Sequence, residues 1–320
     1  MLSRRLLRIK VLQALYAHFI SENDRIDIGE RQLFVSIDKL YELFMYQLSL
    51  LAEITDFERQ RMEEAKSKFL PTAEELNPNT RFTDNRFIGQ LVKNRDFKRH
   101  IDLLKISWVD NDELIRKLNN QIRESKEYAK YLEQEKDSYD DDKSFIIKIF
   151  LKIICQSELL MSIYEEKSIY WANDYDTVSM LIQKTVKEYR EGWDEFKPLP
   201  GIFDSNGEGD PNDDKEFVRQ LYRKTIIHSK EFDEIITRKA DNWDYERIAQ
   251  MDIILLKMAI AELTEFPSIP VKVTLNEYIE LSKSFSTPKS KVFINGILDN
   301  LINEFKESKR IKKTGRGLME

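Results

Sequence analysis

Glycine and proline are nearly absent from the first 190 residues of this 320-residue chain, which contain two residues of each type. Folds made of many short strands need frequent turns, and these two residue types supply most turns. Long helices contain few of either, because both destabilise a helix interior. The scarcity therefore predicts an all-α fold. At about 150 residues per domain, the length favours two domains.

Composition argues against several classes of protein. No stretch approaches the roughly 18 consecutive apolar residues of a membrane-spanning helix. The N-terminus lacks the long apolar core and small-residue cleavage site of a secretory signal. The single cysteine, Cys155, excludes an intramolecular disulfide framework. It lies in an apolar run, where we expect a buried, unreactive thiol. We therefore expect a soluble cytoplasmic protein.

The net charge of −6 is distributed unevenly. Residues 1–21 and residues 305–320 each carry a charge of +4, which leaves −14 on the rest of the chain. Basic ends on an acidic body often indicate contact with a polyanion. They can equally serve solubility alone, and charge by itself favours that simpler interpretation. Any nucleic-acid site must be local, because the acidic body would repel phosphate.

Hydrophobic periodicity predicts helices along most of the chain. The expected ranges are 3–20, 30–66 (as one helix or a hairpin), 86–106, 110–135, 213–238, 244–264, 271–285 and 288–306. Residues 197–212 hold three glycines and three prolines, so we predict a linker there.

An internal similarity relates residues 141–182 to residues 213–254, without gaps and at an offset of 72. The two segments share 11 identities in 42 pairs, among them Trp171 with Trp243. One interpretation is a duplicated helical unit. The other is chance similarity between amphipathic helices. The shared Asp-Asp-Lys start and the tryptophan spacing favour duplication.

Sequence signatures of enzymes are missing. The chain has no phosphate-binding loop, dinucleotide-binding fingerprint, H-E-x-x-H motif or G-x-S-x-G motif. Its three histidines form no His-x3-His pair, and the acidic run at residues 140–142 lacks the spaced oxygen ligands of a cation-binding loop. We predict no catalytic residue, no metal site and no cofactor.

Four segments resemble the NusB family. They are RRLLRIKVLQALY at 4–16, NWDYERIAQMDIILLKMAIAEL at 242–263, IPVKVTLNEYIELSKSF at 269–285 and KVFINGILD at 291–299. The resemblance covers about residues 2–20 and 213–305. It implies a NusB-like helical bundle with an arginine-rich first helix at 1–22, an inserted helical region at 23–205, a helical domain at 206–306 and a basic tail at 307–320.

The resemblance implies a non-catalytic transcription antitermination factor. Such a factor binds single-stranded box A-type RNA of ribosomal RNA leaders together with NusE, a small-subunit ribosomal protein, within the RNA polymerase antitermination complex. An alternative is a helical protein–protein adaptor with little or no RNA binding. The NusB-like module of a ribosomal RNA cytosine methyltransferase would require a catalytic cysteine after the module. Cys155 precedes it, so we expect no enzyme.

The resemblance also assigns site residues by position. RNA binding falls to Arg4, Arg5, Arg8, Lys289, Lys291 and Phe293. Guanidinium groups pair with phosphates and stack on unpaired bases, which suits single-stranded RNA. Phe293 is equally consistent with a core position. Contact with NusE falls to Tyr16 and Asp252, whose simpler interpretations are a tyrosine at the edge of the core and a solvated aspartate.

Overall fold

The computed structural model describes residues 4–21, 25–134, 137–203, 211–240 and 248–318. These residues form α-helices and short 3-10 turns and contain no strand, which confirms the all-α prediction. None of the described helices is long and apolar enough to cross a membrane. The predicted linker at 197–212 and the start of the helix predicted at 244–264 lie partly outside the described residues.

The chain divides into two compact units. Unit 1 comprises residues 1–37 and 202–320, and unit 2 comprises residues 38–201. Helix α2 (Ile26–Lys66) is one continuous helix of 41 residues with residues in both units, so the hairpin alternative is wrong. The two units are defined by contacts within the fold and not by comparison with other proteins. The description of residues 23–205 as an insertion therefore stays a prediction.

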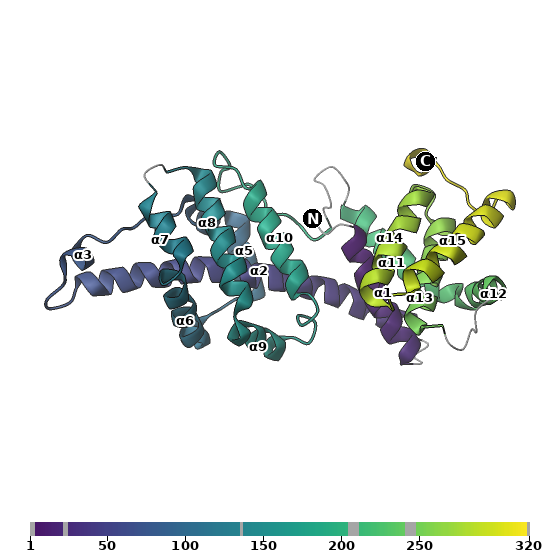
Figure 1. The fold of residues 1–320 in the computed structure, drawn as a ribbon, viewed down its shortest axis with the longest axis horizontal. Coiled ribbons are helices and arrows are strands. Elements are labelled where there is room, and N and C mark those ends of the chain that lie inside the picture. The colour runs from purple at the N-terminus through teal and green to yellow at the C-terminus, as the bar shows by residue number, and fades with distance from the viewer. Residues whose placement is uncertain (1–3, 22–24, 135–136, 204–210, 241–247, 319–320) are drawn as a thin grey trace. The chain divides into compact units, whose positions relative to one another are not determined.

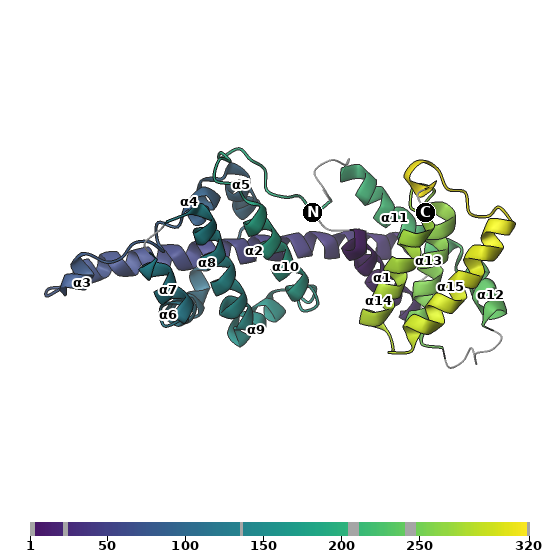
Figure 2. The ribbon, with the colours of Figure 1, turned by 45° about the horizontal axis from the view of Figure 1, so that its top comes forward.

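Unit 1 surrounds one central helix. Besides the start of α2, it contains α1 (Arg4–Ile20), α11 (Pro211–Ile227), α12 (Ser229–Lys239), α13 (Gln250–Glu265), α14 (Val271–Phe285) and α15 (Ser290–Glu307). Helices α1, α11, α14 and α15 all contact or lie beside α13, as both ribbon views show (Figures 1 and 2). Eleven of the sixteen residues of α13 are buried, so its neighbours cover it on nearly every side.

Unit 2 packs short helices on the rest of α2. They are α3 (Ala73–Leu76), α4 (Arg86–Lys93), α5 (Arg95–Leu104), α6 (Asp112–Arg123), α7 (Lys126–Glu133), α8 (Tyr139–Lys152), α9 (Glu158–Lys167) and α10 (Tyr175–Glu188). Trp171 fills the core between α2 and α9. Its ring centroid lies 5.2 Å from that of Tyr46 and 5.5 Å from that of Tyr164, and its indole N–H donates to the Lys39 carbonyl at 2.8 Å.

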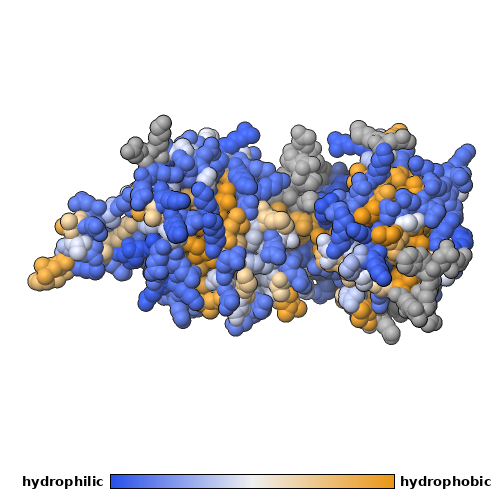
Figure 3. All heavy atoms as spheres, in the orientation of Figure 1, coloured by the Kyte–Doolittle hydropathy of each residue, from blue (hydrophilic) through white to orange (hydrophobic). Residues whose placement is uncertain are grey.

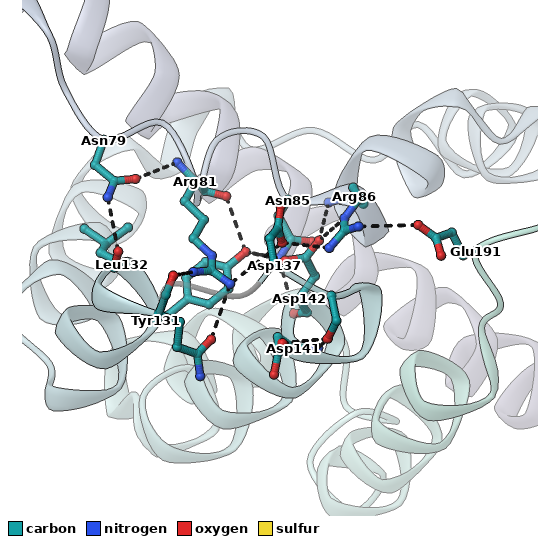
Figure 4. A network of polar contacts seen from close by, with 12 residues as sticks. Asn79, Arg81, Asn85, Arg86, Tyr131, Leu132, Asp137, Asp141, Asp142 and Glu191 are labelled. Carbon is teal, nitrogen blue, oxygen red and sulfur yellow. Dashed lines mark hydrogen bonds and ion pairs between the residues drawn. The ribbon is translucent and has the colours of Figure 1, made fainter.

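In the acidic run at residues 140–142, the carboxylates of Asp141 and Asp142 accept hydrogen bonds from protein side chains (Figure 4). Asp142 is buried, and its carboxylate accepts hydrogen bonds from Arg86 Nε at 2.8 Å and from the Tyr131 hydroxyl at 2.7 Å. Burial and the hydrogen bond to Asp142 raise the pKa of Tyr131, so it stays a donor at neutral pH. Asp140 is exposed and pairs with Lys143. Within the described parts of the chain, no group of His, Cys, Asp and Glu side chains could hold a metal ion.

Helix boundaries follow the internal similarity. At the offset of 72 residues, α8, α9 and α10 fall on α11, α12 and α13, with ends that differ by a few residues. Asp142 and Asp214 are equivalent in this alignment, and both are buried in the first turn of a helix. Each accepts from the Nε of an arginine that begins another helix: Arg86 of α4 at 2.8 Å and Arg4 of α1 at 3.0 Å. Trp243 lies outside the described residues. The duplicated unit stays a prediction. The two segments share a buried aspartate in the first turn of a helix that accepts from an arginine of another helix.

Candidate functional site

A cavity of about 600 Å³ lies at the start of α1 in unit 1. Four arginines line its wall, together with one carboxylate and an apolar rim around Ile269. Three of these arginines, Arg4, Arg5 and Arg8, come from the first turns of α1, as the resemblance predicted. The fourth, Arg316, comes from the C-terminal tail. The cavity therefore brings together cations from both ends of the chain, and we call it the arginine cavity.

Arg8 belongs to the interior of unit 1. Its side chain is 2% exposed, and its Nε and Nη2 each donate to the fully buried carboxylate of Glu262 at 2.7 Å. Thr274 and Tyr278 of α14 donate to the same carboxylate at 2.9 and 3.2 Å. The predicted surface role of Arg8 thus does not match its position. Its guanidinium joins α1 to α13 and α14, and a bidentate buried pair of this kind fixes geometry.

Arg5 and Arg4 remain at the surface. Arg5 is 48% exposed, and its Nε and Nη2 donate to Glu277 at 2.9 and 2.7 Å. Hydrogen bonding to Glu277 raises the pKa of Arg5, so it is charged at every physiological pH. Arg4 is 39% exposed, donates from Nε to Asp214 and lies over the Phe217 ring. In both arginines an outer nitrogen has no hydrogen bond within the described residues, which leaves donors for an anionic ligand.

The other predicted RNA-binding residues lie at the start of α15. Lys289 and Lys291 are exposed and have no ion pair among the described residues. Phe293 is 5% exposed, so it is a core residue and not a stacking platform. These lysines follow the end of α14, whereas Arg5 pairs with Glu277 in the middle of α14. The helix from Glu277 to Phe285 rises roughly 12 Å. Neither lysine lines the arginine cavity, so the structure does not bring all six predicted RNA-binding residues into one site.

The two predicted partner-binding residues differ in exposure. Tyr16 is 40% exposed on α1 and is open to a partner. Asp252 is 5% exposed, and its carboxylate accepts from the Ser290 hydroxyl at 2.7 Å. The solvated-aspartate interpretation is therefore wrong. In this structure Asp252 ties the first turn of α13 to the first turn of α15, and its carboxylate does not reach the surface.

Two carboxylates that pair with the α1 arginines were missed at the sequence level. Glu262 is the one charged residue in the stretch 258–263 of α13, and a lone acid in an apolar stretch indicates a buried ionic partner. Glu277 carries no such signal, because acids are common on exposed helix faces. Neither partner could be assigned, since Glu262 lies 254 residues from Arg8 and Glu277 lies 272 residues from Arg5.

Comparison with known proteins finds a family similarity in residues 178–303. The sequence model of the NusB family matches residues 178–303, from α10 into α15. A protein of Salinibacter ruber named transcription antitermination protein NusB is 44% identical over 105 residues, which are 33% of this chain and 66% of the relative. Proteins of the same name from Chloroherpeton thalassium and Oleidesulfovibrio alaskensis are 41% identical over 106 residues and 44% identical over 100 residues.

The matches cover only part of this chain and only part of each relative. They cover 33% and 31% of this chain, and 50% and 63% of these last two relatives. No solved structure matches the chain. The family match excludes α1, so the family likeness of residues 4–16 stays a prediction.

Proposed function

We propose, from the premise that this chain carries a NusB family domain at residues 178–303, that it is a non-catalytic transcription antitermination factor. It binds single-stranded, box A-like RNA of ribosomal RNA leaders, together with NusE, as part of the RNA polymerase antitermination complex in the cytoplasm. The observation that carries RNA binding is the arginine cavity, where exposed guanidinium groups converge on one hollow. A cofactor has no part in this function.

The chemistry of the cavity suits a single strand of RNA. Arg4 and Arg5 offer unused N–H donors to phosphate oxygens, and charge-assisted bonds of this kind are strong. Their planes can also stack on unpaired bases. The carboxylates hold both arginines in place before RNA arrives, so fewer side-chain rotations are lost on binding. Glu277 also competes with phosphate for Arg5. The ion pair between Arg5 and Glu277 therefore lowers the affinity of the site for RNA.

Direct measurement of RNA binding tests this proposal. Fluorescence anisotropy with a labelled box A-like RNA and a scrambled RNA, with and without NusE, gives affinity and selectivity together. We expect tighter binding of the box A-like RNA when NusE is present. We also expect log K to fall linearly with log salt, with a slope of about −0.7 per phosphate contacted. Equal, weak binding of both RNAs at all salt concentrations would contradict the proposal.

Neutralising either partner of the ion pair between Arg5 and Glu277 tests the role of the cavity in RNA binding. We expect Arg5→Gln to weaken RNA binding about three- to tenfold, since a cation is lost and Glu277 keeps only its longer ion pair with Arg8 at 3.8 Å. We expect Glu277→Gln to strengthen it by a similar factor, because Arg5 is then free for phosphate. Both variants break the same pair, so a merely structural effect would change both affinities in the same direction. Lys230→Gln, an exposed cation that does not line the cavity, is the control for net charge.

A second candidate function is a helical protein–protein adaptor. The observation that favours it is the turn between α2 and α3 in unit 2, where Phe69 is 97% exposed and Leu70 is 81% exposed (Figure 3). Apolar side chains in such a position are suited to contact with another protein. The adaptor proposal predicts no salt-dependent RNA binding, so the anisotropy measurement separates the two functions.

A further inference from the structure

The chain turns back on unit 1 after its last long helix. Lys309 follows the α15 C-cap in the left-handed conformation, with φ of 55°. Its N–H donates to the Lys306 carbonyl, and the next N–H, of Arg310, donates to the Phe305 carbonyl. This hydrogen-bond pair is the Schellman motif, which ends a helix and reverses the chain. Arg310 also packs over the Phe305 ring and pairs with Glu231, so the direction of the tail is fixed at its first residues.

The tail then docks on the end of α13. Lys313 Nζ donates to the Phe266 carbonyl at 2.9 Å, and the Thr314 N–H donates to the Pro267 carbonyl at 2.9 Å. Carbonyls at a helix C-terminus lack partners within the helix, and a lysine there satisfies one and complements the helix dipole. Burial lowers the pKa of Lys313 to about 8. The tail is thus held by specific bonds over residues 313–314.

Gly317 makes the closest contact of the docked tail. It is buried in the short 3-10 turn Gly315–Leu318, and a Cβ at this position would lie 1.9 Å from the Pro267 carbonyl oxygen. That atom belongs to backbone that already accepts a bond from Thr314, so it cannot give way cheaply. Only glycine allows the tail this approach. The approach places Arg316, the preceding residue, in the wall of the arginine cavity.

Arg316 changes the charge balance of the cavity. Each of the three α1 arginines is paired with at least one carboxylate, whereas Arg316 is exposed and has no ion pair among the described residues. The four arginines outnumber by one the three carboxylates that pair with them, of which only Glu277 lines the cavity, and Arg316 is the arginine without a carboxylate partner. A phosphate group can reach Arg316 without breaking an existing ion pair.

We propose that Arg316 is an RNA-binding residue, positioned by the docked tail as the uncompensated cation of the arginine cavity and directed at a phosphate of the bound RNA. This inference rests on the proposed RNA-binding function and deepens it. The tail lies beyond the family match, which ends at residue 303. Gly317 and Lys313 hold the tail against the residues that follow α13, and this contact makes Arg316 part of the cavity wall.

Two variants separate the charge from the docking. We expect Arg316→Gln to weaken binding of the labelled box A-like RNA about three- to tenfold at low salt, and to reduce the salt slope by about 0.7. We expect Gly317→Ala to weaken it similarly with every charge retained, and to speed trypsin cleavage within the tail. The double variant should bind RNA no more weakly than Gly317→Ala alone. Both changes remove the same contact, between Arg316 and a phosphate of the RNA. Lys312→Gln removes an exposed charge of the same tail outside the cavity wall and should leave affinity within about twofold.

The outcomes of these experiments distinguish failure of the inference from failure of the proposed function. If the parent protein binds RNA and Arg316→Gln binds it as tightly as the parent or as Lys312→Gln, the inference is wrong and the proposed function stands. If Gly317→Ala frees the tail to trypsin without loss of affinity, docking has no role in RNA binding and the inference is likewise wrong. If the parent itself shows no salt-dependent binding, the proposed function fails and takes the inference with it.

Discussion

Arg8→Ala is expected to destabilise unit 1 by about 3–5 kcal/mol, the cost of breaking a buried ion pair. The substitution leaves the Glu262 carboxylate, which is fully buried, without its cation. Thr274 and Tyr278 would still donate to it, but two neutral hydroxyls do not offset a buried negative charge. The effect is large because Arg8 connects α1 to α13, the central helix of the unit.

Calorimetry is the appropriate measurement, since we expect the two compact units to unfold in separate transitions. We expect the transition of unit 1 to move to lower temperature and that of unit 2 to stay in place. Arg25→Ala is the matched control, because Arg25 forms an exposed pair with Asp27 and such pairs contribute little. An unchanged melting profile for Arg8→Ala would show that the buried pair does not hold unit 1 together.

Trp171→Ala is expected to destabilise unit 2 by about 3–5 kcal/mol and to leave RNA binding unchanged. Trp171 is 2% exposed, so its removal opens a large cavity between α2 and α9, and the hydrogen bond from its indole N–H to the Lys39 carbonyl is lost. The arginine cavity lies wholly in unit 1. Our account therefore separates the stability of unit 2 from RNA affinity.

The same variant tests which unit binds RNA. Anisotropy measured above the melting temperature of the weakened unit 2, but below that of unit 1, reports on unit 1 alone. Retained affinity supports an RNA site confined to unit 1. Affinity that falls with the unfolding of unit 2 would mean that unit 2 takes part in RNA binding. Ile169→Ala, which truncates a neighbouring side chain that is 83% exposed, should change neither stability nor affinity.

Local pattern was enough to locate most helices. The range 271–285 was predicted as observed, and the first helix differs by one residue. The range 213–238, predicted as one helix, is divided into α11 and α12 without a side-chain cap at His228. Two other errors arose where a polar side chain begins a new helix inside a continuous apolar pattern. Asn94 divides the range 86–106 because its side chain caps α5 at the Phe97 N–H, and Ser125 divides 110–135 by capping α7 at Tyr128. Such caps compete with helix continuation without disturbing the hydrophobic period.

The site was harder to predict than the fold. Arginine spacing in α1 indicates one cluster but cannot show which member turns inward. The distinction depends on Glu262, which is far away in sequence and placed by the packing of α13. The role of Arg316 depends in turn on Gly317, whose missing side chain matters only beside the Pro267 carbonyl. Long-range contacts of this kind decide exposure, and exposure decides which arginines RNA can reach.

Terminator readthrough tests the central claim most directly. Purified RNA polymerase would transcribe a template that carries a box A-like sequence or a scrambled one upstream of a terminator, with NusE and this protein added together or singly. We predict more full-length transcript when both proteins are present on the box A-like template, and no increase on the scrambled one. Unchanged readthrough on both templates, under conditions where the protein binds the RNA, would contradict an antitermination role.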